Sequence, residues 1–144
     1  MLKKYIIPVA FIFLLIFNLS CSSSRRTMAI EEGWELLGEL KVDFARDKDQ
    51  LDINSSSKYS AIRFKVENRE VKIRDLKIVF SNLDKLEPAI DEVISADQYS
   101  KVIDLGVDGK EVRSIEFKYR STGNFLKGRA HVLIFGKRYV RPTY

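Results

Sequence analysis

The chain has 144 residues, a formal net charge of +5 and a single cysteine. This length suits one modest domain and is too short for two domains of ordinary size. One cysteine excludes an internal disulfide and a cluster of cysteine metal ligands. A small net charge, with no stripe of clustered Lys and Arg, argues against a nucleic-acid partner.

The chain begins with the layout of a secretory signal. Lys3 and Lys4 form a short cationic start, and the apolar run from Tyr5 to Phe17 is interrupted only by Pro8. An apolar region of roughly 7 to 15 residues is typical of a signal peptide. As a helix this run would cover only about 20 Å of the roughly 30 Å hydrocarbon core of a membrane. We therefore expect residues 1–20 to be a signal peptide for export and not a membrane span.

The only cysteine lies directly after this segment, in the stretch NLSC, and three serines follow it. The stretch resembles the bacterial lipobox, in which the cysteine is alkylated with diacylglycerol and its new amino terminus is acylated, for example with palmitate. Ser20 fits the small residue before the cysteine, whereas Asn18 stands where the common pattern has leucine. The resemblance implies that Cys21 carries lipid, and several acyl chains hold a protein on a membrane far more firmly than one.

Lipidation predicts a place in the bacterial cell envelope, with the membrane as one partner. Ser22 favours sorting to the outer membrane over the inner membrane. Residues 21–32 are then the lipidated cysteine and a short flexible tether, in which Arg25 and Arg26 lie close to the bilayer. Without the predicted signal the chain keeps 23 basic and 20 acidic residues, a charge of +3.

From residue 33 onward the pattern is typical of β-strands. Apolar and polar residues alternate with period two, which is the signature of strands with one buried and one solvent-facing side. We predict an all-β fold, a single antiparallel β-sandwich of about 7–8 strands over residues 33–137, followed by a basic and aromatic tail at 138–144. The predicted strands are centred on residues 40–44, 62–66, 76–80, 102–105, 115–119 and 130–135.

Turn signals separate these runs, at residues 47–49, 54–57, 67–70, 108–109 and 121–124. Asp108-Gly109 is the sharpest predicted hairpin, because glycine accepts the positive φ of a tight turn. Residues 87–99, with Pro88 near their start, have two possible interpretations: a crossing at the edge of a strand, or one short helical turn.

Several segments of the predicted domain resemble a group of small exported bacterial domains of unknown function. The shared features are a tryptophan-leucine-glycine start and an apolar last strand that ends in glycine. The resemblance implies a β-sandwich and supplies no site residues, because no activity is established for that group. The segments are Gly33-Trp34-Glu35-Leu36-Leu37-Gly38, Ile62-Arg63-Phe64-Lys65-Val66, Asp75-Leu76-Lys77-Ile78-Val79-Phe80, Ile115-Glu116-Phe117-Lys118-Tyr119 and Ala130-His131-Val132-Leu133-Ile134-Phe135-Gly136.

Trp34 lies where the tether meets the first strand. A large aromatic residue there is expected to plug the end of the core. The alternative is an exposed ring that stacks on a sugar.

His131 is the only histidine. The chain has no Gly-x-Ser-x-Gly elbow, no glycine-rich phosphate loop and no His-x-x-His pair, so we expect no cofactor. A hydrolase that uses loop carboxylates with His131 is the catalytic alternative. It would require a pocket in which His131 and two carboxylates converge.

Three aspartates, Asp47, Asp49 and Asp52, could offer oxygen ligands to Ca²⁺ from one loop. The glycine and the distal glutamate of an EF-hand are missing, and side chains that bond to their own backbone in a hairpin are the competing interpretation.

Cations gather near the predicted last hairpin and in the tail. If the last two strands pair around residues 121–128, then Lys118, Arg120 and Arg129 come close together. Such a set could bind anionic glycans or lipid headgroups, or could protect an edge against aggregation. A basic interaction module requires these cations to share one face without interspersed acids. The candidate anion-binding residues are Lys118, Arg120, Lys127, Arg129, Arg138 and Arg141.

The sequence therefore predicts a membrane-anchored envelope lipoprotein with a β-sandwich that acts by binding or as a structural element, and not as an enzyme. Its expected partners are the membrane, through the lipid, and an envelope protein or a glycan.

Overall fold

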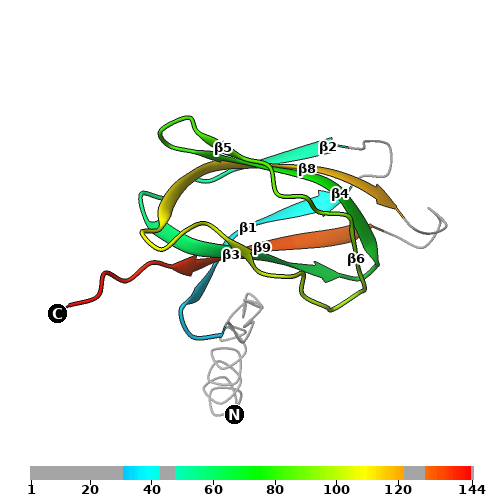
Figure 1. Ribbon diagram of the computed structural model, residues 1–144. Helices are drawn as coiled ribbons and strands as arrows, with labels where there is room; N and C mark the ends of the chain where they lie inside the picture. Colours follow the sequence, from blue (N-terminus) through cyan, green and yellow to red (C-terminus); the bar gives the residue numbers. More distant parts are fainter. Residues whose placement is uncertain (1–30, 43–47, 122–128, 144) are drawn as a thin grey trace, which may run out of the picture.

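The computed structural model describes residues 31–42, 48–121 and 129–143 (Figure 1). Within these ranges the regular elements are all strands, and no helix there has the length and apolar character needed to cross a membrane. The strands are β1 (Trp34–Val42), β2 (Lys48–Asp52), β3 (Lys58–Glu67), β4 (Val71–Phe80), β5 (Lys85–Leu86), β6 (Glu92–Ile94), β7 (Ile103–Asp104), β8 (Lys110–Ser121) and β9 (Ala130–Arg138).

The strands form two antiparallel layers. Sheet A has the order β1-β9-β3 with β7 on the outer edge of β3, and sheet B has the order β2-β8-β4 with β5 and β6 on the outer edge of β4. The first residues of β3 and β8 also pair, at Lys58↔Glu111, so the two layers are joined at one corner. The predicted antiparallel β-sandwich is confirmed, and the described residues contain nine strands, of which β5 and β7 have two residues each.

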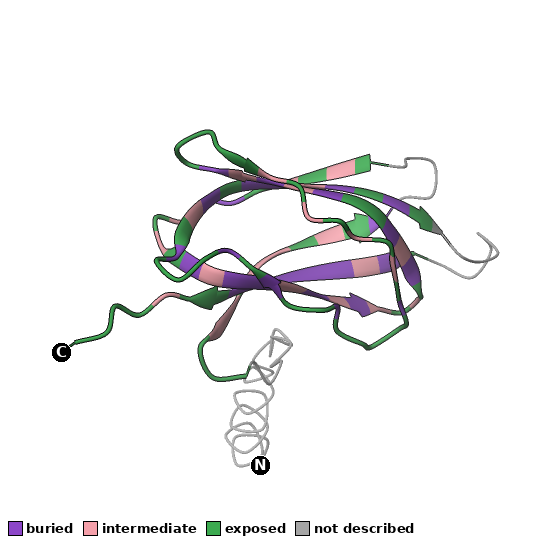
Figure 2. Cartoon of the chain, viewed as in Figure 1, coloured by how far each residue is buried: buried purple, intermediate pink, exposed green. Residues whose placement is uncertain are grey.

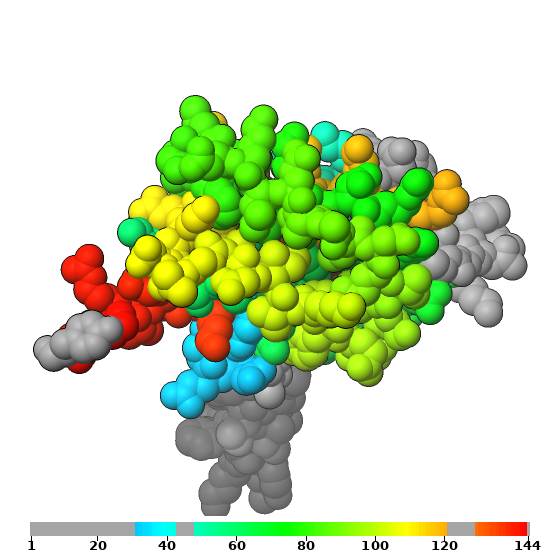
Figure 3. Space-filling model, in the orientation of Figure 1, coloured from blue at the N-terminus to red at the C-terminus, as the bar shows by residue number. Residues whose placement is uncertain are grey.

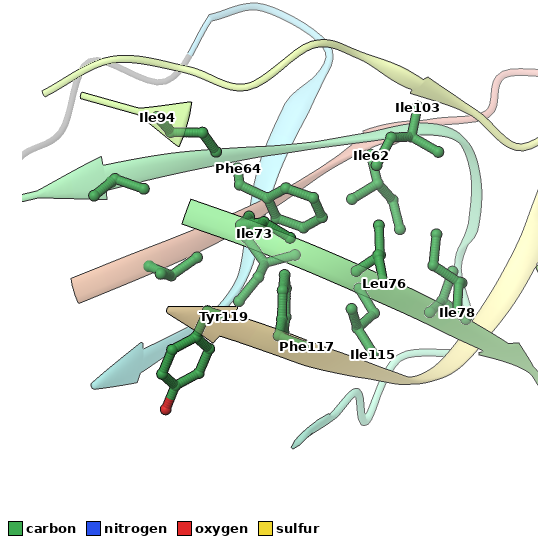
Figure 4. Close-up of a cluster of buried hydrophobic side chains, with 14 of the residues drawn as sticks. Ile62, Phe64, Ile73, Leu76, Ile78, Ile94, Ile103, Ile115, Phe117 and Tyr119 are labelled. Atoms are coloured by element: carbon green, nitrogen blue, oxygen red, sulfur yellow. The ribbon is translucent and has the colours of Figure 1, made fainter. Parts of the chain in front are cut away.

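The core lies between the two layers (Figures 2 and 4). Alternation brings Phe64 of β3 and Phe117 of β8 together in an edge-to-face contact, with ring centroids 4.9 Å apart. Burying these apolar side chains is the main favourable term in folding, at about 25 cal/mol per Å² of apolar surface. Further members of the core are Tyr59, Ile62, Val66, Ile73, Leu76, Ile78, Ile115, Tyr119, Val132 and Ile134.

A β-bulge interrupts the alternation in β4. Its register with β8 shifts between Ile73 and Asp75. Ile73 and Leu76 are consequently both buried although they are three residues apart, and Arg74 and Asp75 are both exposed. Bulges of this kind redirect side chains and are frequent beside functional sites.

The connection from β4 to β8, residues 81–109, covers one side of the sandwich (Figures 1 and 3). Its strands β5 and β6 pair with β4 in sheet B, whereas β7 and Tyr99 pair with β3 in sheet A. Residues 87–99 within it follow the strand edges without a helical turn, as the interpretation of a strand-edge crossing expected.

Three local predictions are wrong. The turn expected at residues 47–49 is replaced by β2, which begins at Lys48. Gly109 has the expected positive φ of +61°, but β7 and β8 do not form a hairpin, because both pair with β3. The last two strands do not pair either: β8 pairs with β2 and β4, and β9 pairs with β1 and β3.

Candidate functional site

A surface groove with a volume of about 640 Å³ lies on the outer face of sheet B. Strands β2, β4 and β8 supply its floor, and residues 87–91 form one wall. A volume of roughly 300 to 1,000 Å³ is usual for ligand-binding sites. The lining residues are Lys48, Arg74, Asp75, Leu76, Lys77, Glu87, Pro88, Ala89, Ile90, Asp91, Glu116 and Lys118.

The groove lies where the strand pairing along the edge of β4 is interrupted. β6 pairs with β4 as far as Ile73↔Glu92, and β5 pairs with it again only at Ile78↔Leu86. Residues 74–77 of β4 therefore have no strand partner on this edge. Proline has no N–H to offer to a sheet, so Pro88 favours the departure of residues 87–91 from β4.

Four cations and four carboxylates line the groove. Lys48 lies 2.8 Å from Glu116, Lys118 lies 3.7 Å from Asp75, and Lys77 lies 3.9 Å from Glu87. Within the part of the chain that the structure describes, Arg74 is the lining cation that forms no ion pair. Its guanidinium can donate two parallel hydrogen bonds to a carboxylate.

The surroundings of Glu116 change its acidity. The hydrogen bond from Lys48 holds the pKa of Glu116 below its usual range, and the charges of Lys48, Lys77 and Lys85 add to this effect. Glu116 therefore stays ionised to a lower pH than an ordinary glutamate, and it keeps Lys48 bound at the rim of the groove.

The structure separates the cations that the sequence suggested as an anion site. Lys118 lies in the groove, and Arg120 is exposed two residues further along β8. Arg129 precedes β9 in the other sheet, and Lys127 lies outside the described residues. Arg138, at the far end of β9, donates to Glu35 Oε2 at 2.6 Å, and Arg141 is exposed in the tail. The cations do not share one face, and carboxylates lie among them, so the condition for a basic module is not met.

His131 lies on the outer face of sheet A, where its Nδ1 is hydrogen-bonded to Glu39 of β1. Glu67 of β3 is its register partner on the other side. None of the three grooves described on the surface includes His131. The convergence in a pocket that a hydrolase would need is absent from these grooves.

Asp49 and Asp52, the two described aspartates of the predicted calcium loop, do not converge. Asp49 accepts a hydrogen bond from the hydroxyl of Tyr119, and Asp52 accepts one from Gln50 Nε2 at 2.7 Å. Asp49 and Asp52 are three residues apart in β2 and so point to opposite faces of the strand. Asp47 lies outside the described ranges, and within those ranges no group of three His, Cys, Asp or Glu side chains could hold a metal ion.

Trp34 is not the plug of the core that the sequence suggested. It lies on the outer face of sheet A, where the Arg63 guanidinium stacks 4.2 Å from the Trp34 ring centroid and 4.3 Å from that of Tyr99. The Tyr99 ring also contacts Phe135, with centroids 5.9 Å apart. We call Trp34, Leu36, Arg63, Tyr99 and Phe135 the aromatic face. Phe135 is only 1% exposed and is buried against the Tyr99 ring. The alternation of β1 was the sequence signal that could have placed Trp34 outside the core.

Comparisons with known proteins give one family and two distant structures. No curated protein matches the chain. Two mutants of a family 29 carbohydrate-binding module, made to probe ligand recognition, are similar in structure. The first has 19% identity and a TM-score of 0.36 over 74% of this chain and 71% of that one. The second has 17% identity and a TM-score of 0.32 over 78% of this chain and 84% of that one. A family model described as a domain of unknown function, DUF2541, matches residues 9–136, and the chain belongs to this family.

Proposed function

We propose that this chain is a lipid-anchored envelope protein whose β-sandwich binds a partner and does not catalyse a reaction. The signal-like start, the lipobox-like NLSC and the following serines support lipidation at Cys21. The groove on sheet B is the binding site.

The observation that carries this proposal is the stretch of β4, residues 74–77, that lacks a strand partner inside a groove. Backbone groups on an unpaired sheet edge are a template for an added extended chain, which supplies its own N–H and C=O groups. The ligand is accordingly an extended segment of another envelope protein.

The charges of the groove indicate which segment it accepts. Three of the four lining cations already have carboxylate neighbours, which disfavours a polyanionic glycan, whose charges would meet Asp75, Glu87 and Glu116. Arg74 is the lining cation left for the ligand, and it suits one carboxylate. The segment therefore carries an acidic residue opposite Arg74.

The position of His131 supports binding over catalysis. Its hydrogen bond to Glu39 lies on sheet A, and the groove lies on the outer face of sheet B. A general base must lie within hydrogen-bond reach of its substrate. A ligand in the groove is out of that reach.

Site-specific crosslinking tests the proposal. Because acylation occupies Cys21, an Ala89→Cys variant offers one free thiol at the wall of the groove, and a Val107→Cys variant offers one at a site that is 88% exposed and outside it. A photoactivatable group at position 89 in intact envelopes should trap a protein, and the adduct should be lost with Arg74→Glu and kept with Arg113→Glu. Equal trapping at positions 89 and 107, or trapping at neither, would contradict binding in the groove.

A further inference from the structure

The aromatic face lies on the opposite side of the sandwich from the groove. We propose that this face, together with Lys65 and Lys137, docks on the surface of the lipid bilayer to which Cys21 is attached. This inference rests on the lipid anchor in the proposed function and adds an orientation: sheet A meets the membrane, and the groove on sheet B faces away from it.

The first argument is the point at which the tether reaches the domain. Glu31 Oε2 lies 2.9 Å from Arg63 Nη1, and the Glu31 carbonyl accepts a 3.0 Å hydrogen bond from the Trp34 N–H. Residues 31–33 leave β1 on the side formed by sheet A (Figure 1). Nine residues lie between Cys21 and Glu31, and ten steps of at most about 3.6 Å limit the distance between these two residues to about 36 Å. The tether therefore enters the domain on the side of sheet A, within about 36 Å of the lipidated cysteine.

The second argument is the kind of side chain exposed there. Tyr99 is 42% exposed and Leu36 is 39% exposed, although both lie beside the well-packed strands β3 and β9. Trp34 is partly exposed and belongs to no part of the core. Trp and Tyr are enriched at membrane interfaces, because there the apolar ring can contact lipid while its polar N–H or O–H group contacts water or headgroups.

The third argument is charge. Lys137 is exposed and is the register partner of Trp34, so the two side chains share a face. Arg63 and Lys65 follow on β3, and both stack on Tyr99, at 4.3 Å and 6.0 Å. Glu31 and Glu67 are the carboxylates paired with them. The side chains of Arg63 and Lys65 are only 12% and 22% exposed and their charges are balanced by these carboxylates. Lys137 is therefore the cation of this surface that extends its charged end to lipid phosphates.

The test uses Trp34, which is the only tryptophan in the chain. The mature acylated protein, beginning at Cys21, is reconstituted into vesicles of anionic and zwitterionic phospholipids in which part of the lipid is brominated near the headgroup. Docking predicts that brominated lipid removes most of the Trp34 emission, while iodide in the water removes little of it. Lys137→Glu should reverse this preference on anionic vesicles, and Lys85→Glu, an exposed lysine of sheet B, should not.

A variant with the tryptophan on the other sheet tests whether quenching by lipid arises only because the whole domain is close to the anchor. In the variant Trp34→Phe with Val79→Trp, the probe lies on the outer face of sheet B and should be quenched by iodide and spared by brominated lipid. Thermal melts establish that each variant is folded. Equal lipid quenching at positions 34 and 79 would overturn the orientation.

Two further outcomes would overturn docking. In one, Trp34 remains open to iodide on the vesicles. In the other, a soluble glycan or protein, and not lipid, shields it. The mass of the reconstituted protein distinguishes a failure of docking from a failure of the lipid anchor. If Cys21 is acylated and the aromatic face does not dock, the anchor of the proposed function still stands and only the orientation is wrong.

Discussion

Phe64 and Phe117 meet edge to face across the two sheets, with their ring planes at 78° and their centroids 4.9 Å apart. Both rings are almost fully buried. Each belongs to a strand that the alternating sequence pattern predicted, and their contact joins β3 of sheet A to β8 of sheet B.

Truncation of either ring should strongly destabilise the domain. Phe117→Ala should lower the free energy of unfolding by about 3–5 kcal/mol, because a cavity remains where the ring was. Urea denaturation of the single variants and of the double variant with Phe64→Ala measures the coupling, which should be about 0.5–1.5 kcal/mol. Strict additivity would show that the two rings do not interact.

Gly109 should resist substitution for two reasons. Its φ of +61° disfavours any residue with a Cβ, and a Cβ at this position would lie 2.6 Å from the Cβ of Tyr139. Gly109→Ala should therefore destabilise the domain by more than the roughly 1–2 kcal/mol of the backbone term alone. In the background of Tyr139→Gly the contact with Tyr139 is gone, and the cost should fall toward the backbone term, with the 3.3 Å approach to the Cβ of Lys58 still present. A cost that is the same in both backgrounds would exclude the contact.

The ion pair between Lys48 and Glu116 should contribute to stability only above acidic pH. The folded pKa of Glu116 lies below its unfolded value. Its contribution is therefore present above the unfolded pKa of about 4.3 and is lost as the pH falls through the folded value. Lys48 is 51% exposed, so the contribution is that of a surface pair, about 0.2–1 kcal/mol.

Urea midpoints at two pH values measure this contribution. At pH 7, Lys48→Met should unfold at lower urea than the unmodified protein, and near pH 2 the two should coincide. Lys41→Met, a change at an exposed lysine of β1, should show no such pH dependence. A difference that persists unchanged at low pH would contradict the assignment to Glu116.

The sequence predicted the long strands well and their pairing poorly. Residues 62–66 and 115–119 alternate cleanly because one side of each faces the core. β2 was missed because Leu51 is its only apolar residue, as expected for an edge strand that is mostly exposed. Which strands pair depends on how the connections cross between the sheets. Residues 67–70 take the chain from sheet A to sheet B, and the alternation of apolar and polar residues does not predict that crossing.

The groove also could not be predicted from the sequence. It depends on two strand-pairing registers, at Ile73 and Ile78, that end on either side of a bulge. Pro88 was the one local signal, since it marked a strand-edge crossing without showing that a groove would result. Lys118 was predicted as part of a cation cluster. In the fold it forms an ion pair with Asp75 and lines the groove.

The lipid anchor is the central claim, and mass spectrometry of the protein purified from its own membranes tests it most directly. The account predicts a chain that begins at Cys21 and whose first peptide is heavier by a diacylglycerol and an acyl group. An unmodified thiol at position 21, or a processed Cys21→Ser protein that stays bound to membranes, would contradict it.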